Sequence, residues 1–171
     1  MRTTKVEVLP YDKNWAKEYQ KIKAELLSVI EENIIAMEHV GSTSVEGLWA
    51  KPIIDIDVVI ESNQRQNIIN QLATIGYQHE GNLGIEGREA FKYDNKPHLM
   101  THHLYVCSKD SAELNRHITF RDYLRSHPLD RGQYSKIKQQ GALLYPNDIE
   151  KYIEYKSPVI EAIYRKCGLL P

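Results

Sequence analysis

The spacing of apolar side chains divides this chain into a first part with several strands and a second part that is helical. Helical spacing is clearest near the start, where the apolar stripe contains Trp15, Tyr19, Ile22, Leu26 and Ile30. Dense apolar runs, which are typical of buried strands, occur at residues 36–40 and 52–60. A short edge strand is expected at residues 6–9, and Pro10 would end it.

Between residues 60 and 110 the pattern predicts another helix and three more strands. Ser62 is the expected N-cap of a helix that carries Ile68 and Leu72 and ends before Gly76. Strands at residues 77–80 and 89–93 would form a hairpin around a Gly-rich loop. A further strand is expected at residues 98–106.

The remaining chain predicts three helices, at residues 111–127, at 129–145, and from a cap at Asn147 to Cys167. A length of 171 residues suits one domain. We therefore predict a single α+β domain over residues 1–171. Its mixed sheet and its site would lie within residues 39–106, and C-terminal helices would occupy residues 111–168.

Composition excludes several classes of protein. The chain is 42% apolar and 26% charged, which is ordinary for a globular protein. A net charge of −1 gives no overall attraction for nucleic acid, and two cysteines make no disulfide framework. No apolar run approaches the length of a membrane span, and the N-terminus lacks the apolar core of a signal peptide. We expect a cytoplasmic protein with no membrane partner.

Two acids interrupt the apolar strand at residues 52–60. Asp55 and Asp57 are two positions apart, so their carboxylates lie on the same face, roughly 6–7 Å apart along the strand. Burying two like charges is costly unless a positive charge compensates them. A divalent cation is the natural candidate, and a structural ion network with Lys51 or an arginine is the alternative.

A Gly-Ser turn precedes this strand. Glycine at position 41 would let an anion approach the backbone amides, and Ser42, Thr43 and Ser44 would add small hydroxyls. Together, the Gly-Ser turn and the pair of acids predict a site of two parts. The turn would hold a triphosphate, and the acids would hold Mg²⁺ bridging its oxygens.

Basic side chains in the helical part are candidates for binding the same phosphates. Lys138 and Lys156 fall at positions where the helical period calls for apolar residues, so each needs an anionic partner or must extend its ammonium to solvent. Arg121 would join them from the first of these helices, although an ion pair with Asp122 explains it equally well.

The run H-V-G-S-T-S-V-E-G-L-W-A-K-P-I-I-D-I-D resembles the GrpB family, and its Gly-Ser and Asp-x-Asp parts resemble the nucleotidyltransferase superfold of DNA polymerase beta. The segments H-H-L-Y-V and F-R-D-Y-L-R, with the pairs Tyr134/Lys138 and Tyr152/Lys156, extend the resemblance over nearly the whole chain. It implies a nucleotidyltransferase-like mixed sheet packed with helices. GrpB-like domains also occur fused to dephospho-CoA kinase, which implies a link to nucleotide or coenzyme A metabolism.

Members of that superfold usually add a third carboxylate from a neighbouring strand. The expected strand at residues 98–106 has no acid, and His103 or His102 occupies the place, only one of which can face the acids. We take Asp55, Asp57 and His103 as the candidate catalytic and metal-binding set, with Mg²⁺ or Mn²⁺ as the metal. Glu89 and Asp94 are weaker candidates for the missing acid.

Three functions fit these residues. The first is a metal-dependent nucleotidyltransferase that binds an NTP at Gly41, Ser42, Thr43, Ser44, Lys51, Arg121, Lys138 and Lys156 and acts on an unknown acceptor. The second is a non-catalytic module that binds a nucleotide or a coenzyme A-type ligand. The third is a metal-dependent hydrolase that uses the aspartates and the histidine. The sequence predicts no oligomeric state.

Overall fold

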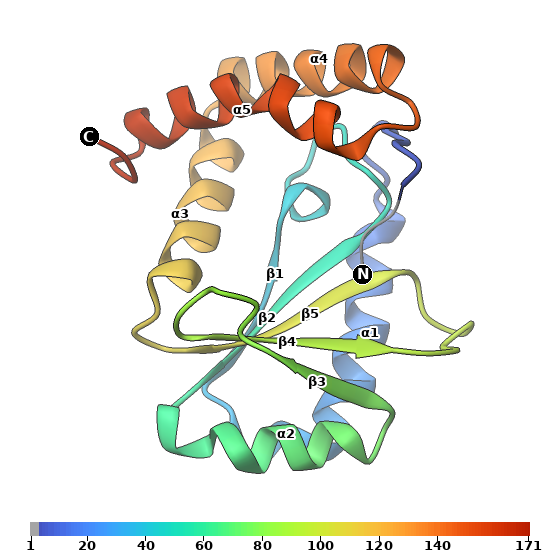
Figure 1. Ribbon diagram of the computed structural model, residues 1–171, viewed down its shortest axis with the longest axis vertical. Coiled ribbons are helices and arrows are strands. Elements are labelled where there is room, and N and C mark those ends of the chain that lie inside the picture. The colour runs from blue at the N-terminus through green and yellow to red at the C-terminus, as the bar shows by residue number, and fades with distance from the viewer. Residues whose placement is uncertain (1–3) are drawn as a thin grey trace.

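The computed structural model describes residues 4–171, which fold around one mixed sheet (Figure 1). The strands are β1 (Ala36–Val40), β2 (Ile54–Ile60), β3 (Tyr77–Gly81), β4 (Arg88–Tyr93) and β5 (His102–Ser108). Their order across the sheet is β1-β2-β5-β4-β3, and only β2 and β5 run parallel. The expected hairpin of β3 and β4 is confirmed.

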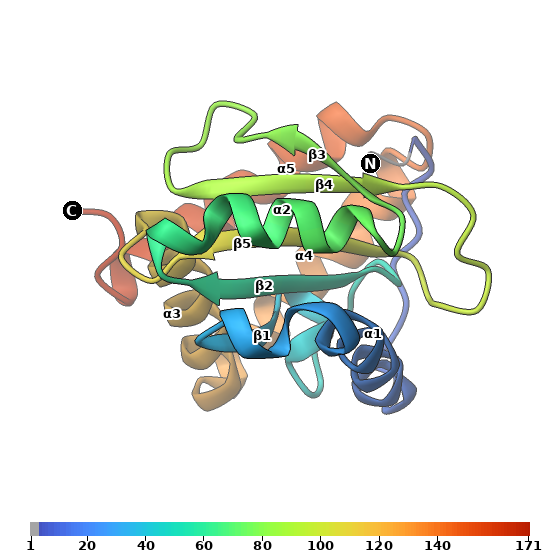
Figure 2. The ribbon, with the colours of Figure 1, turned by 90° about the horizontal axis from the view of Figure 1, so that it is seen from below.

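Helices cover both faces of the sheet. The helices α1 (Asn14–Ile30) and α2 (Arg65–Ala73) lie on one face, as the view from below shows (Figure 2). On the other side, α3 (Ala112–Ser126) rises from the end of β5 to α4 (Pro128–Leu144) and α5 (Ile149–Lys166), which pack against each other (Figure 1). The predicted α+β class, with a mixed sheet and C-terminal helices, is confirmed.

Strand β2 has one apolar face and one polar face. Ile54, Ile56, Val58 and Ile60 pack in the main core with α1 and α2, and the α1 stripe predicted from the sequence is buried there. The alternate positions turn Asp55 and Asp57 to the face beneath α3. The core therefore fixes the register that presents both acids on one side.

Neighbouring strands bring their own side chains to this polar face. Across the parallel pair, Asp55 is level with His103, and Asp57 is level with Tyr105. Across the antiparallel pair with β1, Asp57 is opposite Glu38. Residues that pair in this way share a face of the sheet, so a histidine, a tyrosine and a glutamate surround the two acids.

Several predicted boundaries are wrong because local turns replace ladder bonds. The strand expected from Pro52 begins at Ile54, since the Ile53 amide bonds the Lys51 carbonyl at 2.8 Å. The strand expected from His98 begins at His102, since the preceding segment forms a turn closed by the Leu99 amide on the Lys96 carbonyl at 3.0 Å.

The edge strand at residues 6–9 and two caps are also wrong. Only Leu9 forms a bridge, with Ala50, and the Val6 amide instead bonds the Pro146 carbonyl at 2.9 Å. A short 3-10 turn, η3 (Ser62–Gln64), occupies the predicted start of α2. Asp148 rather than Asn147 caps α5 by accepting the Lys151 amide at 3.1 Å.

Candidate functional site

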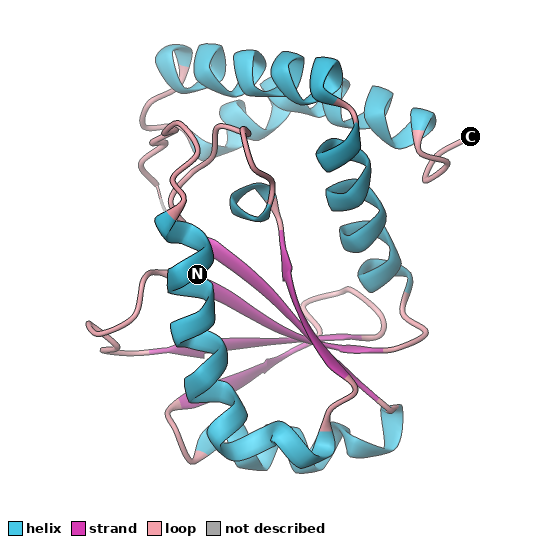
Figure 3. Cartoon of the chain, turned by 180° about the vertical axis from the view of Figure 1, so that it is seen from behind, coloured by secondary structure: helices cyan, strands magenta, loops and turns pink. Residues whose placement is uncertain are grey.

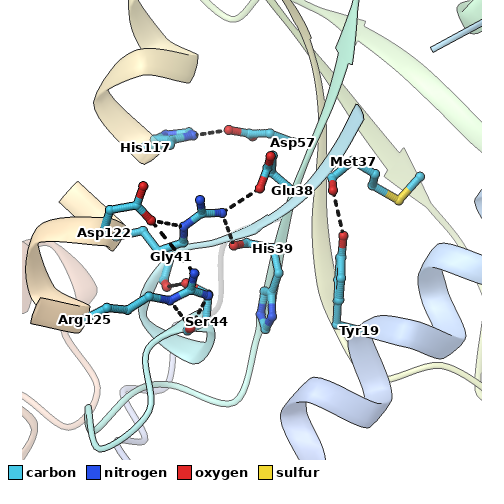
Figure 4. A network of polar contacts seen from close by, with 11 residues as sticks. Tyr19, Met37, Glu38, His39, Gly41, Ser44, Asp57, His117, Asp122 and Arg125 are labelled. Carbon is cyan, nitrogen blue, oxygen red and sulfur yellow. Dashed lines mark hydrogen bonds and ion pairs between the residues drawn. The ribbon is translucent and has the colours of Figure 1, made fainter. Parts of the chain in front are cut away.

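Each acid of the pair contacts a histidine. Asp55 Oδ1 lies 3.0 Å from His103 Nδ1. Asp57 Oδ2 lies 2.6 Å from His117 Nδ1 (Figure 4). Asp55 is half-buried near the start of β2, whereas Asp57 is 0% exposed. The side chain from β5 that faces the acids is therefore His103.

His102 points to the opposite face, where it is 1% exposed in the main core. Its Nδ1 lies 2.8 Å from the Met100 carbonyl, so this nitrogen carries the proton and donates it. Its Nε2 then accepts the Tyr77 hydroxyl at 2.7 Å. His102 is a satisfied core histidine that cannot reach Asp55.

His117 bridges two carboxylates. Its Nδ1 faces Asp57, and its Nε2 lies 2.9 Å from Glu113 Oε1. Burial lowers the pKa of His117, but the hydrogen bonds to Asp57 and Glu113 outweigh burial and raise this pKa to about 9. The hydrogen bond from His117 in turn lowers the pKa of Glu113 to about 2. The ring is therefore an imidazolium that donates from both nitrogens.

The second oxygen of Asp57, Oδ1, is buried and has no hydrogen-bond partner among residues 4–171. A buried carboxylate oxygen without a partner is unfavourable, because desolvation is then uncompensated. A divalent cation would remove this deficit. The orphaned oxygen, together with Asp55 on the same face, fits a hard cation that takes its remaining ligands from phosphate oxygens and water.

The Gly-Ser turn is built against Asp55. Gly41 has φ +72, and a Cβ added there would lie 2.9 Å from Asp55 Cγ and still closer to Oδ2. Only glycine fits this approach. Ser42–Ser44 then form the 3-10 turn η2, and Thr43 Oγ1 donates to the Ile53 carbonyl at 3.2 Å, which ties the turn to the start of β2.

A cavity of about 110 Å³ lies between this turn, the acid strand and the last two helices. Hereafter it is called the acid-lysine cavity. It brings together seven of the residues singled out from the sequence: Ser42, Thr43, Lys51, Asp55, His103, Lys138 and Lys156. Ile53 and Tyr152 complete its wall.

Two lysines reach this cavity from α4 and α5. Lys138 is 3% exposed, so its ammonium does not extend to solvent, and Nζ donates to Ser42 Oγ and, at 3.2 Å, to the Trp49 carbonyl. Burial holds the pKa of Lys138 well below its usual range. Lys156 Nζ lies 4.9 Å from the centre of the Tyr152 ring, and burial, with Lys51 nearby, lowers its pKa to about 8. Within residues 4–171, neither lysine forms an ion pair with a carboxylate.

Two predicted phosphate ligands lie elsewhere. Arg121 Nη1 donates to Glu38 Oε2 at 2.8 Å and to the His39 carbonyl at 3.0 Å, and Nε donates to Asp122, so this guanidinium holds β1 against α3. Ser44 Oγ donates to the Gly41 carbonyl within the turn. Neither side chain lines the acid-lysine cavity.

The candidates for a third acid on the sheet do not reach the pair. Glu89 contacts Arg65 at 2.6 Å and His79 at 2.7 Å, and Arg65 belongs to α2 on the opposite face. Asp94 follows β4 and is exposed. The carboxylates near Asp57 are instead Glu38 from β1 and Glu113 from α3. Within residues 4–171, no three His, Cys, Asp or Glu side chains form a preassembled metal-binding group.

Sequence reasoning missed the role of His117 and Glu113. Their i, i+4 spacing places them on one face of a helix, and this signal is visible in the sequence. What the spacing does not reveal is that α3 packs this face over Asp57. No helix among residues 4–171 is both long and apolar enough to cross a membrane.

Comparison with known protein families assigns this chain to one of them. The model of the GrpB protein family matches residues 5–166. The UPF0157 protein YqkA of Bacillus subtilis is 37% identical over 92% of this chain, which spans 46% of that relative's length. The glutamate-rich protein GrpB of Alkalihalophilus pseudofirmus is 35% identical over 92% of this chain and 93% of its own. A dephospho-CoA kinase of Mycolicibacterium paratuberculosis is 23% identical over 95% of this chain and 46% of its own length.

Among solved structures, the conserved protein GrpB from Enterococcus faecalis is 31% identical and superposes with a TM-score of 0.76, covering 92% of this chain and 99% of that one. A distant similarity links the chain to the Cid1 poly(U) polymerase bound to MgATP, with a TM-score of 0.47, 12% identity, and coverage of 76% and 45% of the two chains.

Proposed function

Because this chain belongs to the GrpB family and carries an acid pair beside two buried lysines, we propose that it is a metal-dependent nucleotidyltransferase that binds an NTP in the acid-lysine cavity. One observation carries the proposal. The Lys138 ammonium is buried with only neutral hydrogen-bond partners, in the same cavity as Asp55. Burial without an anion disfavours the charged form of this lysine and lowers its pKa, so an anionic ligand in the cavity would stabilise the charged form.

Phosphate is the anion that best fits the cavity. A lysine ammonium is a compact charge that binds phosphate well, and Ser42 links Lys138 to the Gly-Ser turn. A volume of about 110 Å³ is well below the roughly 300–1,000 Å³ typical of sites for whole small molecules, which favours a phosphate tail over a complete nucleotide. In this proposal Lys138 and Lys156 hold the phosphate tail while base and sugar lie outside the cavity.

Asp55 and Asp57 would hold the metal, Mg²⁺ or Mn²⁺, and His103 would be either its third ligand or the base. The cation would supply charge neutralisation at the phosphates and a fixed geometry between them and the acids. Gly41 contributes by leaving space against Asp55, since any side chain there would collide with the carboxylate. His117 and Glu113 hold Asp57 in position from α3.

His103 is the residue best placed to act as a base. Its Nδ1 lies 3.0 Å from Asp55 Oδ1, so the imidazole is held beside the acid pair, where in this proposal it would take the proton of an attacking hydroxyl. Asp55 would then orient the imidazole in the required tautomer, as a carboxylate commonly does for a catalytic histidine. The acceptor that brings this hydroxyl is not specified by the cavity.

A non-catalytic binding module is the second candidate, and one observation favours it. Strand β5 carries no carboxylate on the face of Asp55 and Asp57, so the third acid typical of the superfold is absent from the sheet at that place. In this alternative the cavity would bind a nucleotide or a coenzyme A-type ligand without turnover.

Calorimetric titration with ATP, in Mg²⁺, in Mn²⁺ and without metal, tests the proposal. We expect metal-dependent binding that Asp55→Asn and Asp57→Asn each abolish, while the exposed variant Lys136→Gln binds like the parent. Absence of NTP binding under all conditions would refute the nucleotidyltransferase and the nucleotide-binding form of the module. Incubation with labelled NTPs and candidate acceptors then separates them, because the module binds without transferring label. Tight retention of a transition metal through purification would instead favour the hydrolase.

A further inference from the structure

A second and larger cavity lies on the other side of the Gly-Ser turn. Its volume is about 760 Å³, within the range of roughly 300–1,000 Å³ that is typical of small-molecule sites. It is lined by residues from α1 and the segment before it, from the turn and the residues that follow it, and from the ends of α3 and α4 that adjoin each other. In the view from behind, the short turn η2 lies between α1 and α3 (Figure 3). Six residues carry the argument: Tyr11, His39, Ser44, Gly47, Arg125 and Arg131. Hereafter it is called the arginine cavity.

The charge of this cavity is positive. Arg125 and Arg131 line it together with one carboxylate, that of Glu46, which is exposed, and Arg125 also lies 3.9 Å from Asp122 Oδ1 outside the lining. His39 adds no charge near neutral pH, because burial lowers its pKa to about 4. An anionic ligand is therefore favoured over a cationic one.

Arg131 offers a free edge for such a ligand. Its Nη1 donates to the Leu124 and Arg125 carbonyls at 3.1 and 3.2 Å, which orients the guanidinium at the end of α3. Its Nε and Nη2 have no hydrogen-bond partner among residues 4–171. Two parallel N–H groups of this kind match the oxygens of a carboxylate or a phosphate.

Gly47 keeps that edge open. A Cβ added at this position would lie 3.3 Å from Arg131 Nε and 3.9 Å from Nη2, and its φ of +85 also favours glycine. Any larger residue would cover the unused donors. The backbone is thus arranged so that the guanidinium edge stays accessible from the cavity.

Two aromatic rings, those of Tyr11 and His39, also line this cavity. The His39 ring stacks on Tyr19 with centroids 4.7 Å apart, and Tyr11 meets Trp15 edge to face at 5.6 Å. Both Arg125 Nε and Nη2 bond the Ser44 carbonyl, at 3.1 and 2.7 Å, so one guanidinium connects this cavity with the turn (Figure 4). Thr43 lines both cavities.

From these observations we propose that the arginine cavity is a second binding site, for a small molecule that carries a carboxylate or a phosphate, with Arg131 as its principal ligand. The site is separate from the acid-lysine cavity and requires no metal. Because Arg125 bonds the Gly-Ser turn and Thr43 belongs to it, a ligand held here adjoins the backbone that also forms the first cavity.

Two-dimensional amide NMR of the full chain without metal tests this proposal, with citrate and pyrophosphate as the two probes. We expect saturable shifts of the Ser44 and Gly47 amides with at least one probe, and the stronger probe identifies the preferred anion. Arg131→Gln should lower the affinity for that probe about tenfold or more, since a bidentate charged contact is lost. Glu46→Gln should raise this affinity several-fold, and Lys136→Gln should leave it unchanged.

Three results would overturn the proposal: no saturable shift with either probe, equal affinity in Arg131→Gln, or shifts confined to residues of the acid-lysine cavity. Since Arg131 also supports the end of α3, the Glu46→Gln arm is decisive if Arg131→Gln does not fold. Unchanged affinity in Glu46→Gln would then count against the site. Failure here leaves the metal-dependent binding of ATP unaffected, so the two proposals fall separately.

Discussion

The two faces of strand β2 show how one short segment serves stability and chemistry at once. On one face Ile54, Ile56 and Val58 are each 0% exposed and belong to the main hydrophobic cluster. On the other face Asp55 and Asp57 contact histidines, and Asp55 lines a cavity together with two lysines. Burial of apolar groups on the first face stabilises the folded state. Burial of charged groups on the second face destabilises it unless a ligand compensates the charges.

The charged face differs from the apolar one in that its groups are only partly paired within the protein. His103 and His117 each contact one oxygen of an acid, and Lys138 bonds neutral oxygens. Among residues 4–171 these contacts leave Asp57 Oδ1 without a hydrogen-bond partner and Lys138 without an anion that would stabilise its charged form. Substitutions on the apolar face should therefore change the free energy of unfolding, and substitutions around the charged face should change the affinity for ATP.

The largest effect is expected on the apolar face. Ile56→Ala should lower the free energy of unfolding by about 2–5 kcal/mol, because it removes buried methyl groups and leaves a cavity among close-packed neighbours. Urea denaturation measures this loss. The affinity of the remaining folded protein for ATP with Mg²⁺ should stay unchanged. A large loss of affinity without loss of stability would contradict the division between the faces.

Lys138→Met, on the charged side, should weaken ATP binding without lowering stability. Affinity for ATP should fall by about 2–5 kcal/mol, because a buried charged contact to phosphate is lost. The free energy of unfolding should stay the same or rise by about 1 kcal/mol, since an apolar side chain of similar length avoids the desolvation of the ammonium. Calorimetry and urea denaturation measure the two effects, with Lys136→Met as the exposed control on the same helix.

The core face also predicts a loss of stability in acid. Burial lowers the pKa of His102 to about 4, below its unfolded value of about 6.5, so the folded state binds fewer protons than the unfolded state. This contribution is complete above about pH 6.5 and is lost as the pH falls toward 4. It amounts to about 3 kcal/mol at about 1.4 kcal/mol per pH unit.

Urea denaturation between pH 7 and pH 4 measures that slope. His102→Gln removes the titrating group, so the variant should start less stable at pH 7 and lose less stability on acidification. An identical slope in both proteins would show that His102 is not buried in its neutral form.

The smallest effect concerns the pH dependence of ligand binding. Burial lowers the pKa of Lys156 to about 8, and phosphate binds the charged form. Affinity for ATP should therefore be full below pH 8 and fall by no more than about tenfold per unit above it. Lys156→Arg, which stays charged, should flatten the profile. The comparison is best made between pH 7 and pH 9.5, and equal slopes would exclude Lys156 from the phosphate site.

The sequence predicted the apolar face better than the charged one, for a physical reason. Helical and strand periods depend on local burial, so α1 and β2 were recognisable from single segments. His117 meets Asp57 only because α3 packs over the sheet, which is a contact across 60 residues of chain. The same tertiary packing sends Arg121 to Glu38 instead of to a phosphate. Misplaced ends such as Pro52 and His98 arose where a turn competes with the ladder.

The most direct test of the central claim is a crystal structure of the protein with Mn²⁺ and a non-hydrolysable ATP analogue, in which anomalous scattering locates the metal. We predict one manganese at coordination distance, about 2.0–2.6 Å, from oxygens of both Asp55 and Asp57, with Asp57 Oδ1 among them. Phosphate oxygens should contact Lys138 and Lys156. A metal bound away from both aspartates, or phosphates that leave the two lysines without a contact, would contradict the account.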